Sequence, residues 1–492
     1  MRIESLRLEN FRGHVDTVFE FHSNFNLVVG ENGAGKTSLL EAVTIAIGSW
    51  LLGFPGHDSR NIRERDVRRV FDVVERRYRE LPQYPVRVSA QGYVHVAKAS
   101  RNESTGEVEY EALSNGKKNP RELPVEWERS IETAGGKTTR RGAADIKRYA
   151  SIFSDSVLQR EPRILPLIRY FGAGRLWESV RDTEGKALSK HKGKQPADLL
   201  EDADEIDMAL REYDKLSEPF YGYRMSVDKR CNPDDLLRWM AVEYLTELDE
   251  DEYSPALRLV YKAIELFLPE IQSARYVKRL GSLVLNFKSG QRQPFSDLSD
   301  GYRNIVAIVA DLAIKASMLN PQLGEKALDM TPGVVLIDEL DLHLHPRWQR
   351  RVVEDLRRTF PKVQFICTTH SPFLIQTLRD GSELIVLDSP GDSNTDVDSE
   401  SPSIQVLDKL DNLGIETISR GIMGVDAEAS PQYMAMLEAA KEYLAELDEA
   451  AKAPEDRLEE YKRQLSKRIA PFADNPAFQA VLEAERIYKI GK

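Results

Sequence analysis

The chain has 492 residues, of which 41% are hydrophobic and 30% are charged, and this balance is typical of a folded, soluble protein with room for about three domains. Its net charge of −12 argues against a surface that coats nucleic acid, although a local basic patch remains open. The sequence has no apolar stretch long enough to cross a bilayer, and its two cysteines, Cys231 and Cys367, exclude a disulfide scaffold and a cysteine zinc site and favour a reducing, cytoplasmic location.

The first third of the chain predicts strands around one buried helix. Residues 1–29 read as short strands, the last of which is an apolar run ending at Gly30, and residues 37–47 predict a buried helix. The arginine-rich stretch 58–80 predicts a solvated helix with charge pairs, and a phosphate-contacting face is the alternative. An antiparallel patch is expected from three β-rich runs separated by Gly, Asn and Ser clusters, at 86–97, 107–113 and 125–131.

The rest of the chain mixes helices with a second set of strands. We expect helices at 144–153, 234–248 and 255–268, a buried strand at 165–171, a polar insert at 178–216 and a hairpin at 275–288. From 294 to 388 strands alternate with helices, which predicts a parallel sheet with helical crossovers. This divides the chain into an N-terminal lobe with the antiparallel patch, a helical insert, a C-terminal lobe, a linker and a helical tail, at residues 1–177, 178–290, 291–388, 389–425 and 426–492.

A glycine-rich loop stands between the predicted strand and helix near residue 30. The run Gly30–Thr37, GENGAGKT, matches the phosphate-loop pattern in full, with a buried strand before it and a helix after it. Glycines let the backbone curl so that successive N–H groups face phosphates. Lys36 would reach the β- and γ-phosphates of a nucleotide, and Thr37 would hold Mg²⁺. The predicted nucleotide-binding set here is Asn32, Gly33, Ala34, Gly35, Lys36, Thr37 and Ser38.

Two acidic residues follow a second apolar strand, Val334–Ile337. The carboxyl end of a strand is where parallel α/β sheets bind ligands. Asp338 would therefore bind Mg²⁺, directly or through water, and Glu339 would orient and activate an attacking water. An acid pair at a strand end is a weak signal alone, but together with a phosphate loop it predicts ATP hydrolysis.

Three further segments resemble motifs of the ABC-type ATPases. Leu298–Arg303 precedes a helix that Ser299 can cap, and it resembles the signature motif in a Ser-Asp-Gly variant, with Ser299 and Gly301 as nucleotide contacts. His370 follows another apolar strand and resembles the switch histidine that contacts the γ-phosphate. Asp341, just past Glu339, resembles the D-loop aspartate.

Taken in this order, the motifs resemble the AAA-family, ABC-type heads of the SMC and RecF group of ATPases, in a member without a long coiled coil. The opening motif Asn10–His14 is similar to one in which the arginine, here Arg12, faces the nucleotide. The resemblance implies an α/β fold, ATP and Mg²⁺ as ligands, and at least a dimer in which the signature segment closes on the nucleotide of a second subunit. One departure is that the expected Q-loop turn, Phe171–Arg175, contains no glutamine.

Four short segments stand out in the C-terminal part of the chain, with a helical stretch after the second: Gly414–Glu416, Gly421–Val425, Asp474–Phe478 and Glu483–Arg486. In these residues the tail resembles that of the PtuA ATPases of Septu-type and retron-associated anti-phage systems. This resemblance implies a homo-oligomeric ATPase that regulates a separate HNH nuclease of the PtuB kind, with nucleic acid as a further candidate partner and without a membrane. The alternative for the tail is simple packing on the head. The alternative function is a DNA-binding repair ATPase of the RecF kind, and a transporter subunit is a third, less favoured reading because such subunits lack this large insert.

Overall fold

A computed structural model of the chain describes most of its first 387 residues and small parts of the remainder. The described ranges are 1–57, 59–74, 77–101, 108–112, 121–176, 218–250, 253–387, 415, 418–419, 422–423, 441–445, 447–448, 482 and 484–489. The polar insert expected at 178–216, nearly all of the linker and most of the helical tail lie outside them. The chain forms two compact units, one of residues 1–418 with 422–424 and one of residues 419–421 with 425–492.

A five-stranded parallel sheet forms the centre of the first unit. Its order is β15-β3-β14-β13-β9, and its strands are β3 (Phe25–Gly30), β9 (Leu167–Phe171), β13 (Gly333–Ile337), β14 (Val363–Thr368) and β15 (Leu384–Leu387). Every residue of β9, β13 and β14 is buried, as continuous apolar runs in a parallel sheet require. Ile337 pairs with both Cys367 and Phe171, so three strands end side by side at one edge. The parallel sheet predicted from the sequence is confirmed.

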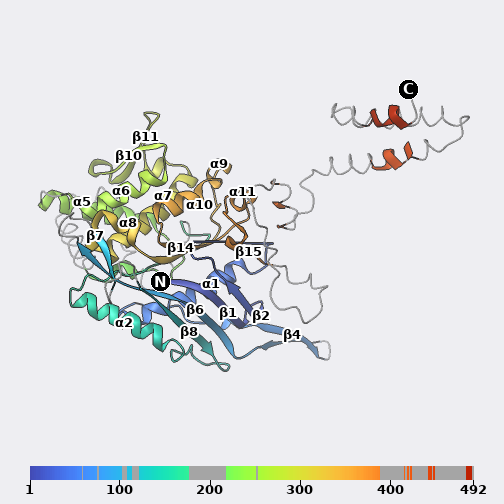
Figure 1. Cartoon of the computed structure of the whole chain (residues 1–492), viewed down its shortest axis with the longest axis horizontal. Helices are drawn as coiled ribbons and strands as arrows, with labels where there is room; N and C mark the ends of the chain where they lie inside the picture. The colour runs from blue at the N-terminus through green and yellow to red at the C-terminus, as the bar shows by residue number, and fades with distance from the viewer. Residues whose placement is uncertain are drawn as a thin grey trace, which may run out of the picture. The chain divides into compact units, whose positions relative to one another are not determined.

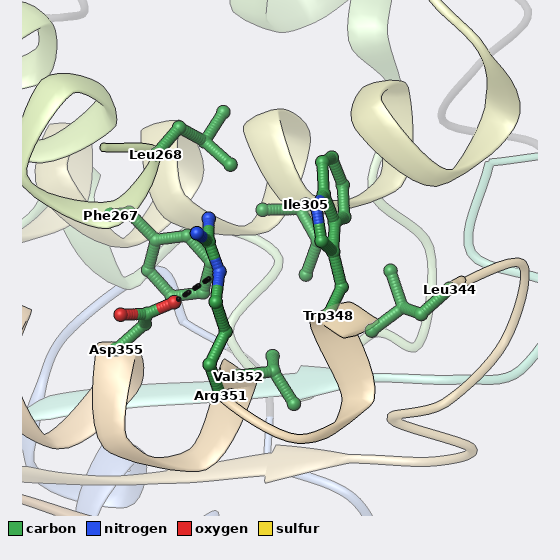
Figure 2. A pocket seen from close by; sticks show the side chains of 8 residues that line it. All are labelled: Phe267, Leu268, Ile305, Leu344, Trp348, Arg351, Val352 and Asp355. Carbon is green, nitrogen blue, oxygen red and sulfur yellow. Dashed lines mark ion pairs between the residues drawn. The ribbon is translucent and has the colours of Figure 1, made fainter. Parts of the chain in front are cut away.

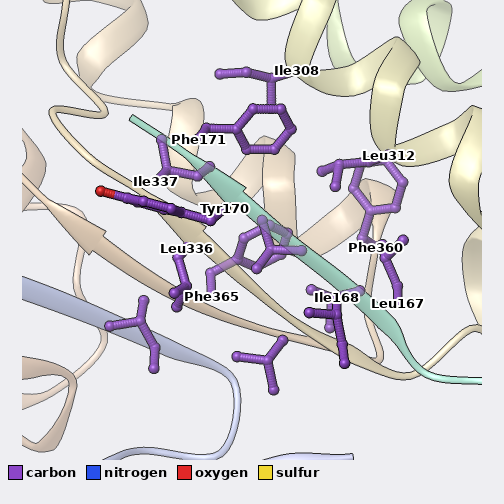
Figure 3. Close-up of a cluster of buried hydrophobic side chains, with 14 of the residues drawn as sticks. Leu167, Ile168, Tyr170, Phe171, Ile308, Leu312, Leu336, Ile337, Phe360 and Phe365 are labelled. Carbon is purple, nitrogen blue, oxygen red and sulfur yellow. The ribbon is translucent and has the colours of Figure 1, made fainter. Parts of the chain in front are cut away.

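Helices cover one face of this sheet, and the largest is α7 (Asp300–Leu319), which is buried along most of its length. Ile308 and Leu312 of α7 lie against Phe171 and Leu167 of β9, next to Phe360, which follows α10 (Val352–Thr359) (Figure 3). Fully burying such a side chain contributes roughly 1.5–3 kcal/mol. This packing fixes the start of α7 relative to the strand ends.

The opposite face packs on the predicted buried helix, α1 (Lys36–Ile47), which also contacts a second, antiparallel sheet (Figure 1). Trp127 of the antiparallel sheet is bonded to α1, because its Nε1 donates a hydrogen bond to the Ala46 carbonyl oxygen at 2.9 Å. The antiparallel patch is confirmed, and α2 (Ala144–Leu158) packs on it. Its strands are β1 (Arg2–Phe11), β2 (His14–Glu20), β6 (Val86–Arg101), β7 (Val108–Ala112) and β8 (Arg121–Ile131).

The helix expected over 58–80 is wrong. This stretch forms a β-hairpin, β4 (Arg69–Val74) paired with β5 (Arg77–Pro82). Val, Phe and Tyr side chains in these runs favour strands over a solvated helix. The charge pairs exist but join strands instead of helix turns, since Arg69 Nη1 lies 2.9 Å from Glu80 Oε2 across the hairpin.

The remaining elements of the first unit form a helical lobe with a small sheet. They are α5 (Pro233–Glu250), α6 (Pro255–Phe267), β10 (Ile271–Val277), β11 (Ser282–Phe287), β12 (Arg292–Pro294), α8 (Ala327–Met330), α9 (Pro346–Gln349) and α11 (Pro372–Ile375). The predicted hairpin turns at Gly281. Residues 346–359 form two helices separated at Arg351, whose φ is −130°. Among the described helices, none has the length and apolar composition needed to cross a membrane.

Candidate functional site

The phosphate loop joins β3 to α1 at the edge where the parallel strands end. Gly30, Gly33 and Gly35 have φ values of 155°, 89° and 97°, which side-chain-bearing residues rarely adopt. A Cβ atom on Gly30 would also lie 2.6 Å from the Leu387 carbonyl oxygen. The loop therefore curls as the motif predicts, with Asn32 and Gly33 exposed at its tip and Ala34 buried beneath.

Lys36, the first residue of α1, turns its side chain back into the loop. Its Nζ donates hydrogen bonds to the carbonyl oxygens of Gly30 and Glu31, both at 2.8 Å. Burial lowers the pKa of Lys36 below its ordinary value, although the carboxylates of Asp338 and Glu339 act in the opposite direction. The ammonium group of Lys36 is thus enclosed by carbonyl oxygens of the loop and lies within the electrostatic influence of Asp338 and Glu339.

Asp338 lies beside Thr37, as predicted for the two residues of a magnesium site. Thr37 Oγ1 donates a hydrogen bond to Asp338 Oδ2 at 3.0 Å. The other carboxylate oxygen accepts a 2.6 Å hydrogen bond from Thr368 Oγ1 at the end of β14. Thr368 is fully buried, and its oxygen also accepts the Glu339 N–H at 2.8 Å. The predicted site residues did not include Thr368, which holds both acidic residues.

Glu339 has a left-handed backbone, with φ at 50°. For a residue with a side chain such a conformation costs about 1–3 kcal/mol and persists only where neighbours enforce it. Here Thr368 holds its N–H, and the guanidinium of Arg175 donates to its carbonyl oxygen at 3.2 Å. The half-buried Glu339 side chain is consequently aimed by backbone contacts on both sides.

Asp341 and His370 meet at the same edge of the sheet. Thr369 Oγ1 donates to Asp341 Oδ1 at 2.6 Å, and the His370 N–H points to that oxygen at 3.4 Å. The His370 side chain is exposed. Residues resembling a D-loop aspartate and a switch histidine are therefore neighbours, although 28 positions separate Thr369 from Asp341.

Arg12 lies beside the first turn of α1, between β1 and β2. Its Nη1 donates to Ser38 Oγ at 3.2 Å, and its Nη2 donates to the buried carboxylate of Asp66 at 2.6 Å and also pairs with Glu41. Burial alone would raise the pKa of Glu41, but Arg60 and Arg12 lower it below its ordinary value. Arg12 is near the predicted nucleotide site, and its charge is shared with two carboxylates.

His14 also lies against the phosphate loop, and the predicted site did not include it. A Cβ atom on Gly35 would lie 3.5 Å from His14 Nε2. Burial lowers the pKa of His14, which favours the neutral imidazole. The sequence signal that could have indicated His14 is its position two residues after Arg12 in the opening motif.

The signature segment, Leu298–Arg303, leads into the first turns of α7. Ser299 occupies the N-cap position and is exposed, but its side chain makes no capping hydrogen bond, unlike the expected cap. A Cβ atom on Gly301 would lie 2.6 Å from the His343 carbonyl oxygen, so the D-loop backbone packs directly on this glycine. Within the described residues, neither Ser299 nor Gly301 bonds to the phosphate loop.

A small pocket lies where residues of α6, α7, α9 and α10 meet, and none of its lining residues belongs to the phosphate loop (Figure 2). Tyr302, next to Gly301, packs edge-on against Trp348 on the rim of this pocket, with ring centroids 4.2 Å apart. The walls of the pocket are mostly apolar, and one side is formed by an ion pair in which Arg351 Nε lies 3.1 Å from Asp355 Oδ2. The contact between Tyr302 and Trp348 packs the start of α7 against α9. The lining residues of the pocket are Phe267, Leu268, Ile305, Leu344, Trp348, Arg351, Val352 and Asp355.

Comparisons with known proteins agree with these motifs. Residues 5–271 match the family described as "AAA domain", and residues 189–376 match the family "AAA domain, putative AbiEii toxin, Type IV TA system". The chain is 26% identical over 408 residues to the Retron Ec83 probable ATPase of Escherichia coli. The aligned region covers 77% of this chain and 70% of that protein.

Other similarities are shorter or more distant. Septu protein PtuA of Bacillus mycoides is 38% identical over 148 residues, 30% of this chain and only 19% of that protein. Among solved structures, the SmcHead bound to the C-winged helix domain of ScpA matches with 16% identity and a TM-score of 0.39, over 78% of this chain and 94% of that one.

Proposed function

The chain belongs to the AAA domain family, and on that premise we propose that it binds and hydrolyses ATP as the ATPase of a retron- or Septu-type anti-phage system. The observation that carries this proposal is the junction of phosphate loop and acid pair, where Thr37 Oγ1 lies 3.0 Å from Asp338 Oδ2 and Lys36 is enclosed by the loop. The names of the relatives support the defence role.

The residues at this junction fit a nucleotide and Mg²⁺. Hydroxyl and carboxylate oxygens are the ligands that Mg²⁺ prefers, and Thr37 and Asp338 supply one of each. The bound cation would neutralise charge on the phosphate oxygens. The curled glycine loop offers backbone N–H groups to the same phosphates, next to the N-terminus of α1.

Each side chain then has a distinct role in the proposed reaction. Lys36 Nζ exchanges its two carbonyl partners for oxygens of the β- and γ-phosphates. The Glu339 carboxylate orients the attacking water and takes its proton. His370, exposed at the end of β14, donates a hydrogen bond to the γ-phosphate. Asp341 keeps the His370 backbone in place through its Oδ1.

We place ATP between two copies of the chain, with Ser299 and Gly301 of one copy completing the site of the other. The exposed, uncapped hydroxyl of Ser299 at the start of a 20-residue helix supports this arrangement. A helix N-terminus favours an anion such as the γ-phosphate. ATP would then hold the copies together and hydrolysis would release them. Arg12 would reach the nucleotide by leaving its carboxylate partners.

We further propose a separate HNH nuclease subunit as the partner, docked on the C-terminal unit of residues 419–421 and 425–492. The similarity to Septu protein PtuA supports this assignment. The lobe and linker boundaries given from the sequence, and a cytoplasmic location, remain part of this proposal. A repair ATPase of the RecF kind is the alternative, and it would bind duplex DNA with a steep salt dependence.

The proposal is tested with two substitutions in the purified chain. Lys36→Ala should weaken ATP binding by roughly 10- to 100-fold, because it removes charge-assisted hydrogen bonds. Glu339→Gln should keep ATP binding and lower kcat by roughly 100-fold or more, because the proton acceptor is lost. Nucleotide binding and phosphate release measure the two effects. Unchanged ATP affinity in the first variant, or normal turnover in the second, would refute the assigned roles.

A further inference from the structure

Arg175 is buried at the predicted Q-loop turn, where the family resemblance leads one to expect glutamine. It follows β9, and only 2% of its surface is exposed. Its Nη1 donates to the carbonyl oxygens of Gly172 at 2.9 Å and Asp338 at 2.7 Å, and its Nη2 donates to that of Glu339 at 3.2 Å. One guanidinium therefore holds the backbone of both acidic residues.

The fourth hydrogen bond of Arg175 leads to the signature helix. Its Nε donates to Asn304 Oδ1 at 2.6 Å, in the second turn of α7. Asn304 is itself 1% exposed, and its Nδ2 donates to the Leu342 carbonyl oxygen at 3.1 Å, in the D-loop. Arg175 and Asn304 thus form a buried link between the acid pair, the signature helix and the D-loop of one chain.

None of these four contacts is an ion pair, so the link is not explained by charge neutralisation. Burial lowers the pKa of Arg175, which is the cost of enclosing a cation among carbonyl and amide oxygens. Only a planar guanidinium supplies donors in fixed directions to so many acceptors at once. A lysine at this position would keep the positive charge but could not donate hydrogen bonds in the same fixed directions.

A second buried arginine on β9 provides an internal comparison. Arg169 also reaches α7, with its Nε 2.8 Å from Asp311 Oδ2, and also donates to backbone carbonyls, those of Met225 and Asp228 among them. Its other backbone partners are the carbonyl oxygens of Tyr170 and Arg230, and it donates no hydrogen bond to Asp338 or Glu339. Arg169 and Arg175 therefore share burial and α7 contact but differ in what they hold.

We propose that Arg175 is a positioning residue that couples the catalytic acid pair to the signature helix. This inference rests on the proposed ATPase function. When nucleotide shifts the backbone of Asp338 and Glu339, Arg175 passes that shift through Asn304 to the start of α7. Since that segment is proposed to complete the site on a second copy, the link connects one ATP site with the next.

The test compares Arg175→Lys, Asn304→Ala and the double variant with Arg169→Lys as the matched control. ATP affinity, kcat and thermal unfolding are measured for each. Arg175→Lys should lower kcat by roughly 10- to 100-fold with ATP affinity within about threefold, since small misplacements of catalytic groups cost this much. The double variant should be no slower than the slower single variant, because both substitutions break one link. Arg169→Lys should lower the unfolding temperature but leave kcat near that of the unmodified chain.

Several results would overturn the inference. Equal losses of kcat in Arg175→Lys and Arg169→Lys would mean that Arg175 acts only through stability. Multiplicative losses in the double variant would mean that Arg175 and Asn304 act separately. If Arg175→Lys does not fold, Asn304→Ala, which keeps the arginine, must show the kcat loss at unchanged affinity. Failure of the proposed function itself has a different signature, namely that the unmodified chain neither binds nor hydrolyses ATP, and it would remove the inference as well.

Discussion

Replacing Thr368 by valine keeps the shape of a fully buried side chain and removes one oxygen. That oxygen donates to the Asp338 carboxylate at 2.6 Å and accepts the Glu339 N–H at 2.8 Å. A hydrogen bond to a charged group contributes about 1.5–3 kcal/mol, and an unpaired buried donor costs about 1–3 kcal/mol. We therefore expect Thr368→Val to lower the free energy of unfolding by about 3 kcal/mol, measured by urea denaturation.

The same substitution should affect catalysis, because Glu339 loses a contact that holds its left-handed backbone. We expect kcat to fall by roughly tenfold or more. Thr359→Val is the matched control, since Thr359 is equally buried and donates a single 2.8 Å hydrogen bond to the Asp355 carbonyl oxygen of α10. It should cost about 1 kcal/mol and leave kcat unchanged. Thr368→Ser, which keeps the hydroxyl, should recover most of the activity. Equal effects of the two valine variants on stability and kcat would refute the reasoning.

Other residues give further predictions. Gly301→Ala should lower kcat at least about tenfold, because its Cβ would lie 2.6 Å from the His343 carbonyl oxygen and displace the D-loop; full activity measured by phosphate release would contradict this contact. Thr37→Val should raise the Mg²⁺ concentration needed for half-maximal ATP hydrolysis, and an unchanged magnesium titration would remove Thr37 from the metal site. Burial lowers the pKa of His14, so the unfolded chain binds the proton more readily and stability falls as pH drops below about 6.5. Denaturation from pH 7.5 to 5.5 should show a smaller loss for His14→Asn, and parallel curves would argue against a neutral buried His14.

Local patterns were sufficient to predict the frame of the site. Continuous apolar runs indicated β13 and β14, and glycine spacing indicated the loop at residues 30–37, because these features depend on neighbours in sequence. The hairpin at 69–82 was mistaken for a helix because charge density outweighed its β-branched and aromatic residues.

The side chains that hold the proposed catalytic groups follow from the fold and not from local patterns. Arg175 and Asn304 are 129 positions apart, and Thr368 acts on residues about 30 positions away. Several of their partners are backbone carbonyl oxygens, which every residue has, so no pattern of residue types in the sequence indicates these contacts. Only the parallel register of β9, β13 and β14 brings these groups to one edge of the sheet.

The central claim is that one chain supplies Lys36 and another supplies Ser299 to the same ATP. Mixing two inactive variants tests it directly, Lys36→Ala with Ser299→Arg, after dissociation and reassembly. In a mixed pair, one site receives intact Lys36 and intact Ser299, so random pairing should restore roughly a quarter of the unmodified ATPase activity. A mixture that stays as inactive as the separate variants, although reassembled, would contradict the shared site.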